Sequence, residues 1–199
     1  MNETARRPFF LFLLMLLGFA LAACGSTAAE EPPLAGAKIG GPFTLVNQHG
    51  RTITDKEFQG KYRIVYFGFA NCPDICPTDL AAISQALKKF EKAKPALGVK
   101  VVPIFISVDP ERDTPARLKD YAAAFHPRLV ALTGSTQQIA DAAKAYAVYY
   151  GKVPADNGDY TMDHMRVAFL MDPDGKPVAM LPNDLGAEAM AAELQRWVR

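Results

Sequence analysis

Cysteine and histidine are both scarce in this chain, which has only three of each among its 199 residues. An excess of charge is also absent, because 22 Lys and Arg residues stand against 21 Asp and Glu residues. A balanced charge gives no reason to expect nucleic acid or an anionic membrane surface as a partner. The sequence contains no internal repeat, which excludes a repeat architecture. The chemistry of the protein is therefore expected to rest on a few identifiable side chains.

One long hydrophobic run is present, at the N-terminus. Pro8 to Ala23 contain no charged residue and follow Arg6 and Arg7, which is the pattern of an export signal and is too short and wrongly flanked for a membrane span. The run ends in the sequence LAAC at residues 21–24. This resembles a bacterial lipobox, in which the cysteine is acylated and becomes the first residue of the mature protein. We therefore predict a lipoprotein signal peptide over residues 1–23 and lipidation of Cys24, with an ordinary signal peptide or an uncleaved anchor as alternatives.

The chain after the predicted signal divides into two segments. Residues 24–41 are rich in proline and small residues, which predicts a lipidated tether. Residues 42–199 are enough for one domain with its own hydrophobic core. Removing residues 1–23 takes away two Arg and one Glu, so the totals of 22 and 21 become 20 basic and 20 acidic residues. We expect an exported protein that its lipid holds to a bacterial membrane, with the domain facing the periplasm or the cell exterior.

Strands and helices are predicted to alternate along the domain. Short runs of β-branched and aromatic residues predict strands, and apolar residues spaced by three and four, such as Leu80, Ile83 and Leu87, predict helices. The predicted strands lie at residues 43–46, 51–54, 62–69, 99–108, 129–133, 167–171 and 177–181, and the predicted helices begin near residues 78, 113, 135 and 187. This order is that of a thioredoxin-like α/β fold. We predict a central mixed sheet flanked by helices, with an N-terminal β-hairpin.

Two cysteines, Cys72 and Cys76, lie where the predicted strand 62–69 should run into a helix. A strand-to-helix turn offers free backbone N–H groups and the positive end of the helix dipole, which favour thiolate over thiol. If the helix begins near Cys72, a spacing of four places both sulfurs on one helix face, with the Cα atoms about 6 Å apart. Such a pair can bind a soft metal or close a disulfide.

Of the three histidines, His164 is the one with a predicted function. His49 lies in a predicted hairpin turn and His126 precedes Pro127 at a helix end, so both are interpreted as surface or capping residues. His164 precedes the predicted strand that begins at Val167, in the loop that faces the cysteine turn of a thioredoxin-like domain. Two thiolates and one imidazole form a three-coordinate soft site, which selects Cu(I). Zn²⁺ would normally require a fourth ligand or an open position.

Residues beside these candidates are predicted to have supporting roles. Asp163 is a candidate to orient the imidazole of His164 as a hydrogen-bond acceptor. Asp109, at the end of a predicted strand, is expected to be structural. Met162 and Met165 flank His164 and could supply soft sulfur ligands, but we interpret them as packing residues.

Three stretches of the sequence carry a family resemblance. They are FGFANCPDICPT at residues 67–78, SVDPERDTP at residues 107–115 and YTMDH at residues 160–164. Together they resemble the Sco/SenC family of copper-binding, thioredoxin-like assembly proteins, and the similarity spans nearly the whole domain. Many members of this family have an N-terminal transmembrane anchor, whereas this chain has the apparent lipobox.

The resemblance implies a ligand set and a role. It implies that Cys72, Cys76 and His164 bind copper, most readily as Cu(I) and with Cu(II) left open. It also implies delivery of copper to the binuclear copper site of cytochrome c oxidase, or reduction of the cysteines of that site. The expected partner is the copper-bearing subunit of cytochrome c oxidase or another periplasmic copper protein.

The residues themselves leave two functions open. A metallochaperone would bind one copper ion and pass it on by ligand exchange. A thiol–disulfide oxidoreductase would use Cys72, the more exposed cysteine, as the attacking or attacked thiol and Cys76 as the resolving thiol. A thiol peroxidase is rejected, because such enzymes need Thr or Ser three residues before the reactive cysteine and Pro four residues earlier. Those positions are Pro73 and Phe69 here.

Overall fold

The computed structural model describes residues 30–155 and 158–199 of the chain. The chain separates into Met1–Glu31 and Pro32–Arg199, and the second unit is the one considered below. No helix within the described ranges is long and apolar enough to cross a membrane. The predicted signal peptide and Cys24 lie outside the described residues, so these two predictions stay predictions.

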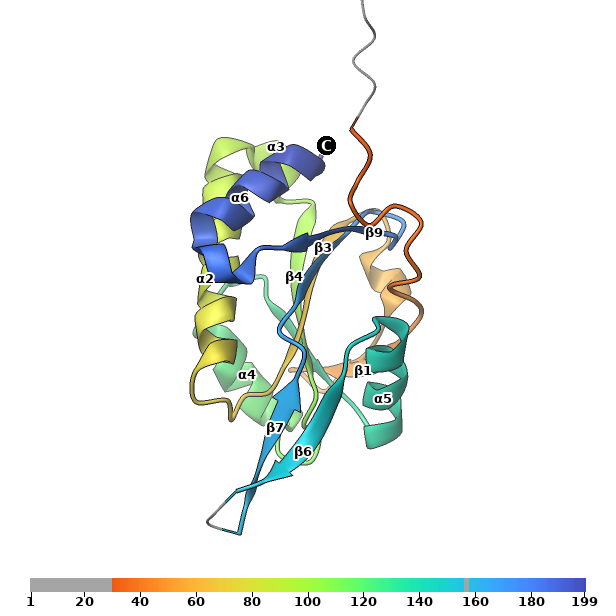
Figure 1. The fold of residues 1–199 in the computed structure, drawn as a ribbon, viewed down its shortest axis with the longest axis vertical. Helices are drawn as coiled ribbons and strands as arrows, with labels where there is room; N and C mark the ends of the chain where they lie inside the picture. The colour runs from red at the N-terminus through yellow and green to blue at the C-terminus, as the bar shows by residue number, and fades with distance from the viewer. Residues whose placement is uncertain (1–29, 156–157) are drawn as a thin grey trace, which may run out of the picture. The chain divides into compact units, whose positions relative to one another are not determined.

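A seven-stranded mixed sheet forms the centre of the domain, with the strand order β2-β1-β5-β4-β3-β8-β9 (Figure 1). The strands are β1 (Thr44–Asn47), β2 (Thr52–Thr54), β3 (Tyr62–Gly68), β4 (Val101–Ser107), β5 (Val130–Thr133), β8 (Ala168–Met171) and β9 (Pro177–Leu181). β3, β4 and β5 are parallel, and the other neighbours pair antiparallel. β3 and β4 are almost entirely buried, as expected for parallel strands that are covered on both faces.

Helices cover both faces of this sheet. Right-handed crossovers place α2 and α4 on one face, where α2 also packs against α6, and α5 lies on the other face with the 3₁₀ helix η2 (Figure 1). The helices are α2 (Ile75–Ala93), α3 (Pro95–Gly98), α4 (Pro115–Ala123), α5 (Thr136–Ala145) and α6 (Gly186–Trp197), and the 3₁₀ helices are η2 (Asp55–Phe58) and η3 (Asn183–Leu185). The predicted thioredoxin-like α/β fold with an N-terminal hairpin is confirmed.

One element is missing from the prediction. The hairpin of β6 (Tyr150–Pro154) and β7 (Tyr160–His164) forms a two-stranded sheet of its own. Most of its side chains are exposed or half-buried, so the hydrophobic alternation that marks a half-buried strand is weak. His164 is therefore the last residue of β7, and not a loop residue at the entrance to β8 as predicted.

The segment before the first strand is attached to the domain. The Leu34 N–H donates to the Val178 carbonyl at 3.0 Å, and the Gly40 N–H donates to the Ala145 carbonyl at 2.9 Å. Gly40 has φ +94°, and a Cβ there would lie 2.6 Å from Cε of Met171. Residues 32–41, which the sequence places in the tether, thus follow the surface of the domain.

Candidate metal centre

The first two sequence motifs meet because β3 and β4 are parallel neighbours. Gly68 pairs with Ser107 at the end of both strands, and the Val108 N–H donates to the Gly68 carbonyl at 2.8 Å. Segments that follow parallel strands leave the sheet at the same edge, which is where open α/β sheets bind ligands. The cysteine turn, the segment after β4 and the hairpin β6–β7 lie at this end of the domain (Figure 1).

Cys72 and Cys76 occupy different structural elements. α2 begins at Ile75, so Cys72 lies in the preceding loop and Cys76 in the first helical turn. The prediction that both sulfurs share one helix face is wrong. Instead, the Cys76 N–H donates to Sγ of Cys72 at 3.4 Å, which satisfies one of the free amides of the helix N-terminus. Both thiols are free; Cys76 is fully buried and Cys72 only partly, which confirms the predicted difference in exposure.

Burial decides the protonation state of Cys76. It raises the pKa of the Cys76 thiol to about 12, so the predicted preference for thiolate is wrong for this residue: desolvation outweighs the helix dipole. The sulfur reaches this position because residue 68 is glycine. A Cβ at Gly68 would lie 3.0 Å from Sγ of Cys76 and equally close to the rings of Tyr66 and Phe105.

His164 presents a lone pair to the buried sulfur. Its Nδ1 lies 3.2 Å from the Met165 carbonyl oxygen, and its Nε2 lies 3.3 Å from Sγ of Cys76. A carbonyl oxygen only accepts, so Nδ1 carries the hydrogen and Nε2 accepts from the Cys76 thiol. Burial lowers the pKa of His164, which keeps the ring neutral. Asp163 is exposed on the opposite side of β7, so the prediction that it orients the imidazole is wrong.

Two aromatic rings flank the imidazole. The ring of Phe69 lies 5.9 Å from that of His164, and the ring of Tyr66 lies 6.3 Å away, both at 88° in edge-to-face geometry. Such pairs are favourable and have a definite orientation. They restrict rotation of the His164 ring away from Cys76.

Asp79 is a buried residue that sequence reasoning missed. Its carboxylate accepts from Tyr66 Oη at 3.0 Å, from Arg166 Nε and Nη2 at 2.8 and 2.6 Å, and from Asn183 Nδ2 at 3.2 Å. Asp79 lies one helical turn after Cys76, and Arg166 lies two residues after His164. The ion pair of Asp79 and Arg166 therefore joins α2 to the segment that follows β7. An acidic residue on the apolar face of a predicted helix was the available signal.

The other histidines and the two methionines beside His164 are interpreted from the sequence as surface, capping or packing residues, and their burial tests this. His49 is exposed, as predicted. His126 is buried, with 3% exposure, and its Nδ1 accepts from the Arg128 N–H at 3.2 Å, so it caps a turn but is not a surface residue. Met162 is buried, as expected for packing, whereas Met165 is 47% exposed and does not fit that interpretation.

The donor set fits a soft metal ion, although the three side chains do not yet converge. Within residues 30–155 and 158–199, no three His, Cys, Asp or Glu side chains form a complete metal site. Cys76 and His164 are adjacent, while the sulfur of Cys72 faces the Cys76 amide. A neutral imidazole with an available lone pair beside one thiol, and a second, more exposed thiol next to it, supply the sulfur and nitrogen donors that Cu(I) prefers.

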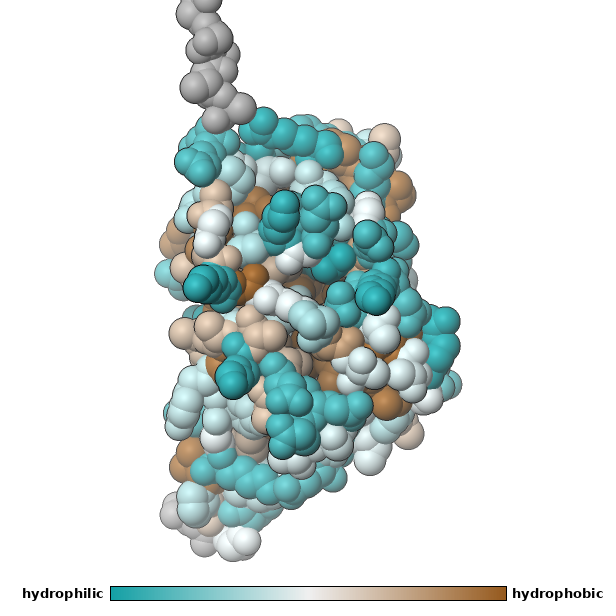
Figure 2. Space-filling view, turned by 90° about the vertical axis from the view of Figure 1, so that its right-hand side faces the viewer, coloured by the Kyte–Doolittle hydropathy of each residue, from teal (hydrophilic) through white to brown (hydrophobic). Residues whose placement is uncertain are grey.

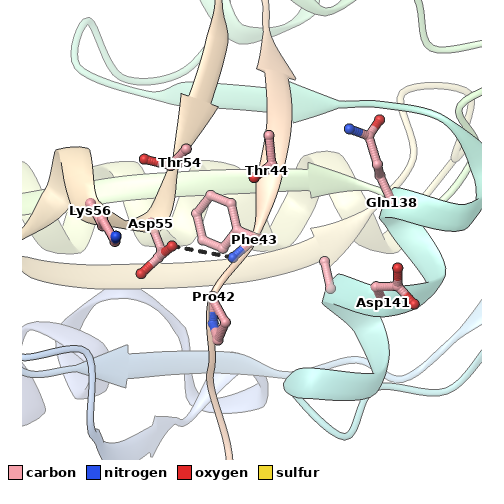
Figure 3. Close-up of a pocket in the computed structure, with 9 residues that line it drawn as sticks. Pro42, Phe43, Thr44, Thr54, Asp55, Lys56, Gln138 and Asp141 are labelled. Carbon is pink, nitrogen blue, oxygen red and sulfur yellow. Dashed lines mark hydrogen bonds between the residues drawn. The ribbon is translucent and has the colours of Figure 1, made fainter.

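A cavity that lies away from these residues offers different chemistry. Hydrophilic residues cover much of the α5 side of the domain, with separate hydrophobic areas between them (Figure 2). A cavity of about 430 Å³ lies between α5 and the ends of β1 and β2 (Figure 3), and is lined by Pro42, Phe43, Thr44, Thr54, Asp55, Lys56, Gln138, Asp141 and Ala142. None of these residues is Cys, His or Met, so the cavity has no soft ligand for copper.

A dithiol turn after the first parallel strand and a histidine facing it define a thioredoxin-like protein with a dithiol–histidine site. The family model described as SCO1/SenC matches residues 31–199. The chain therefore belongs to the SCO1/SenC family.

Relatives of known name and structure agree with this assignment. The mitochondrial SCO1 homolog 1 of Arabidopsis thaliana is 48% identical over 150 residues, which are 75% of this chain and 44% of that protein, so the chain spans less than half of this relative. The structure of Bradyrhizobium japonicum ScoI with copper bound is 46% identical, with a TM-score of 0.72 over 80% of this chain and 99% of that one. BsSco, described as having a disulfide switch and as a member of the Sco family of cytochrome c oxidase assembly proteins, is 27% identical, with a TM-score of 0.61 over 85% and 98% of the two chains.

The ion pair of Asp79 and Arg166 is expected to contribute more to stability than an exposed pair of the same length. Arg166→Ala leaves the fully buried Asp79 carboxylate without its cation, and should lower the free energy of unfolding by roughly 2–4 kcal/mol. Lys89→Ala is the control, because Lys89 and Glu188 are also 2.6 Å apart but largely exposed, and should change it by less than about 0.5 kcal/mol. Urea unfolding measures both. If Arg166→Ala lowered the free energy of unfolding no more than Lys89→Ala, the hydrogen bonds from Tyr66 and Asn183 would be enough to stabilise the buried Asp79 carboxylate.

Proposed function

We propose that this protein binds one copper ion through Cys72, Cys76 and His164 and passes it to a protein of the cytochrome c oxidase assembly route. The observation that carries the proposal is the neutral imidazole of His164, whose Nε2 faces Sγ of Cys76 at 3.3 Å. The family assignment and the copper-bound relative support copper as the metal. Thiolate-rich ligation favours Cu(I), which also accepts three ligands.

The three donors have unequal roles in this proposal. Cys76 and His164 are buried and already adjacent, so they form the fixed part of the site. Cys72 is partly exposed and completes the site by turning its sulfur away from the Cys76 amide. A thiolate of the recipient protein would displace Cys72 first, because the other two donors are inaccessible. Binding also requires the Cys76 thiol to give up its proton, as for any thiolate ligand.

Thiol–disulfide exchange is the second candidate function. Cys72 is the exposed thiol and Cys76 the buried one, which is the arrangement of an attacking and a resolving cysteine. The disulfide switch described for BsSco also favours it. In this alternative the protein reduces the cysteines of its recipient, and only the reduced pair can bind copper.

The recipient and the attachment are inferred from different evidence. We infer from the family that the recipient is the copper-bearing subunit of cytochrome c oxidase or another periplasmic copper protein. From the LAAC sequence at residues 21–24 we infer that a lipid on Cys24 holds the protein to a bacterial membrane, with the domain on the periplasmic or outer side.

Anaerobic titration of the reduced domain with Cu(I) against a competing chelator tests the main proposal. We expect one tightly bound copper ion per chain. Neither cysteine of the copper-bound protein should then react with a thiol reagent. Weak copper binding together with rapid disulfide exchange would replace the metallochaperone by the oxidoreductase.

His164→Ala is expected to separate the two functions. Loss of a ligand should weaken Cu(I) binding by at least about 100-fold, beyond the effect of losing an outer contact. The reduction potential of the cysteine pair should shift by no more than roughly 30 mV, because only the hydrogen bond that the Cys76 thiol donates is lost. His49→Ala, at an exposed turn, is the matched control and should change neither quantity. Unaltered copper affinity in His164→Ala would contradict the three-ligand site.

Cys24→Ala should release the protein from membranes and leave copper affinity unchanged. Release is expected because the proposal makes the lipid on Cys24 the attachment to the membrane. Copper affinity should stay the same because residue 24 lies outside the domain that begins at Pro32. Fractionation of cells that express the full-length variant measures the first effect, and the chelator competition measures the second. Continued membrane association would indicate an uncleaved anchor.

A further inference from the structure

The segment after β4 contains none of the three proposed ligands, yet it contacts both segments that carry them. Ser107 at the end of β4, and Asp109 and Asp113 after it, are each at most 1% exposed. Buried carboxylates persist only where hydrogen bonds or cations compensate their desolvation. The partners of these residues therefore show what the segment holds in place.

Asp113 holds the cysteine turn. Its Oδ2 accepts from the Ala70 N–H at 2.9 Å and from the Ser107 hydroxyl at 2.6 Å. The Arg117 guanidinium, in ion-pair contact with Asp113 at 3.4 Å, also donates to Asn71 Oδ1 at 2.9 Å. Residues 70 and 71 directly precede Cys72, so the position of the loop is set from β4.

Asp109 and Arg112 hold the histidine hairpin. Asp109 Oδ1 accepts from the Tyr160 hydroxyl at 2.8 Å, and its Oδ2 accepts from Arg112 Nε at 2.5 Å. Arg112 Nη1 donates to the Tyr160 carbonyl at 2.8 Å, and its guanidinium lies 3.8 Å above the centre of the Tyr160 ring. Arg112 thus contacts both the backbone carbonyl and the ring face of Tyr160.

The hairpin needs such support. β6 and β7 pair only with each other among the described strands, and of their ten residues only Met162 and His164 are buried. An isolated two-stranded hairpin is at best marginally stable in water. The position of His164 at the end of β7 therefore depends on contacts outside the hairpin's own ladder.

We propose that Arg112 is a positioning residue for His164, which it keeps against Cys76 by fixing Tyr160, at the other end of β7, to Asp109. The proposal rests on the proposed function of His164 as a copper ligand. A lysine cannot replace the arginine fully, since the planar guanidinium donates from two nitrogens while it stacks on the ring.

A double-mutant cycle with chelator-competed Cu(I) binding tests this. Arg112→Ala should weaken binding about 10–100-fold in the native protein, as removal of a supporting contact does. Arg112→Lys should weaken it less. In the His164→Ala background, Arg112→Ala should have no further effect beyond about twofold, because its influence passes through the imidazole.

Two further variants keep the test decisive. Lys152→Ala is the matched control: Lys152 also lies over the Tyr160 ring, at 4.4 Å, and pairs with Glu111 of the same segment, but both side chains are about half exposed. It should change affinity by less than about threefold. If Arg112→Ala does not fold, Tyr160→Phe removes only the hydroxyl that Asp109 accepts, and should weaken binding several-fold in the native background alone.

Three results would overturn the inference. Native affinity in Arg112→Ala would show that the hairpin holds His164 unaided. An equal loss in the native and His164→Ala backgrounds would show that Arg112 acts on the cysteines or on the whole domain. Unchanged affinity in His164→Ala alone would remove the proposed ligand set and the inference with it, and so identifies a failure of the proposed function.

Discussion

The contact between the buried sulfur of Cys76 and Nε2 of His164 is the interaction on which the site depends. The sulfur fits beneath the imidazole only because Gly68 leaves room on β3. Its burial keeps the thiol protonated, and the Met165 carbonyl keeps the imidazole lone pair directed at it. A neutral thiol beside a neutral imidazole can be buried at little electrostatic cost, whereas a thiolate could not. The thiol and the imidazole can therefore share this buried position without a metal ion between them.

Two buried carboxylates and their arginine partners hold the elements that bring this contact together. Asp79 and Arg166 connect α2 with the chain after β7, and Asp109 and Arg112 connect the end of β4 with the beginning of β7. β7 is therefore held near both of its ends. A hairpin outside the main sheet can in this way hold the His164 imidazole against Cys76.

The sequence predicts well those parts whose signals are local. α4 begins at Pro115, two residues after its predicted start, with the Thr114 side chain accepting from the Arg117 N–H, and β8 and β9 lie within the strands predicted at residues 167–171 and 177–181. The start of α2 was predicted three residues late, because hydrophobic periodicity gives no signal before Leu80. The hairpin β6–β7 was missed, since Arg112 and Tyr160 are 48 residues apart. His126 likewise contacts a distant residue, since its Nε2 lies 3.5 Å from Glu91 Oε1, and no local pattern includes that contact.

The hydrogen bonds of Leu34 to β9 and of Gly40 to α5 also decide which part of the chain could act as a spacer. Residues 34–40 follow the surface of the domain, so they add no length between it and the chain that precedes them. If Cys24 carries the proposed lipid, the ten residue steps from Cys24 to Leu34 reach at most about 36 Å when fully extended. The proposed attachment would therefore keep this point of the domain within that distance of the bilayer, and a recipient would meet the domain near the membrane surface.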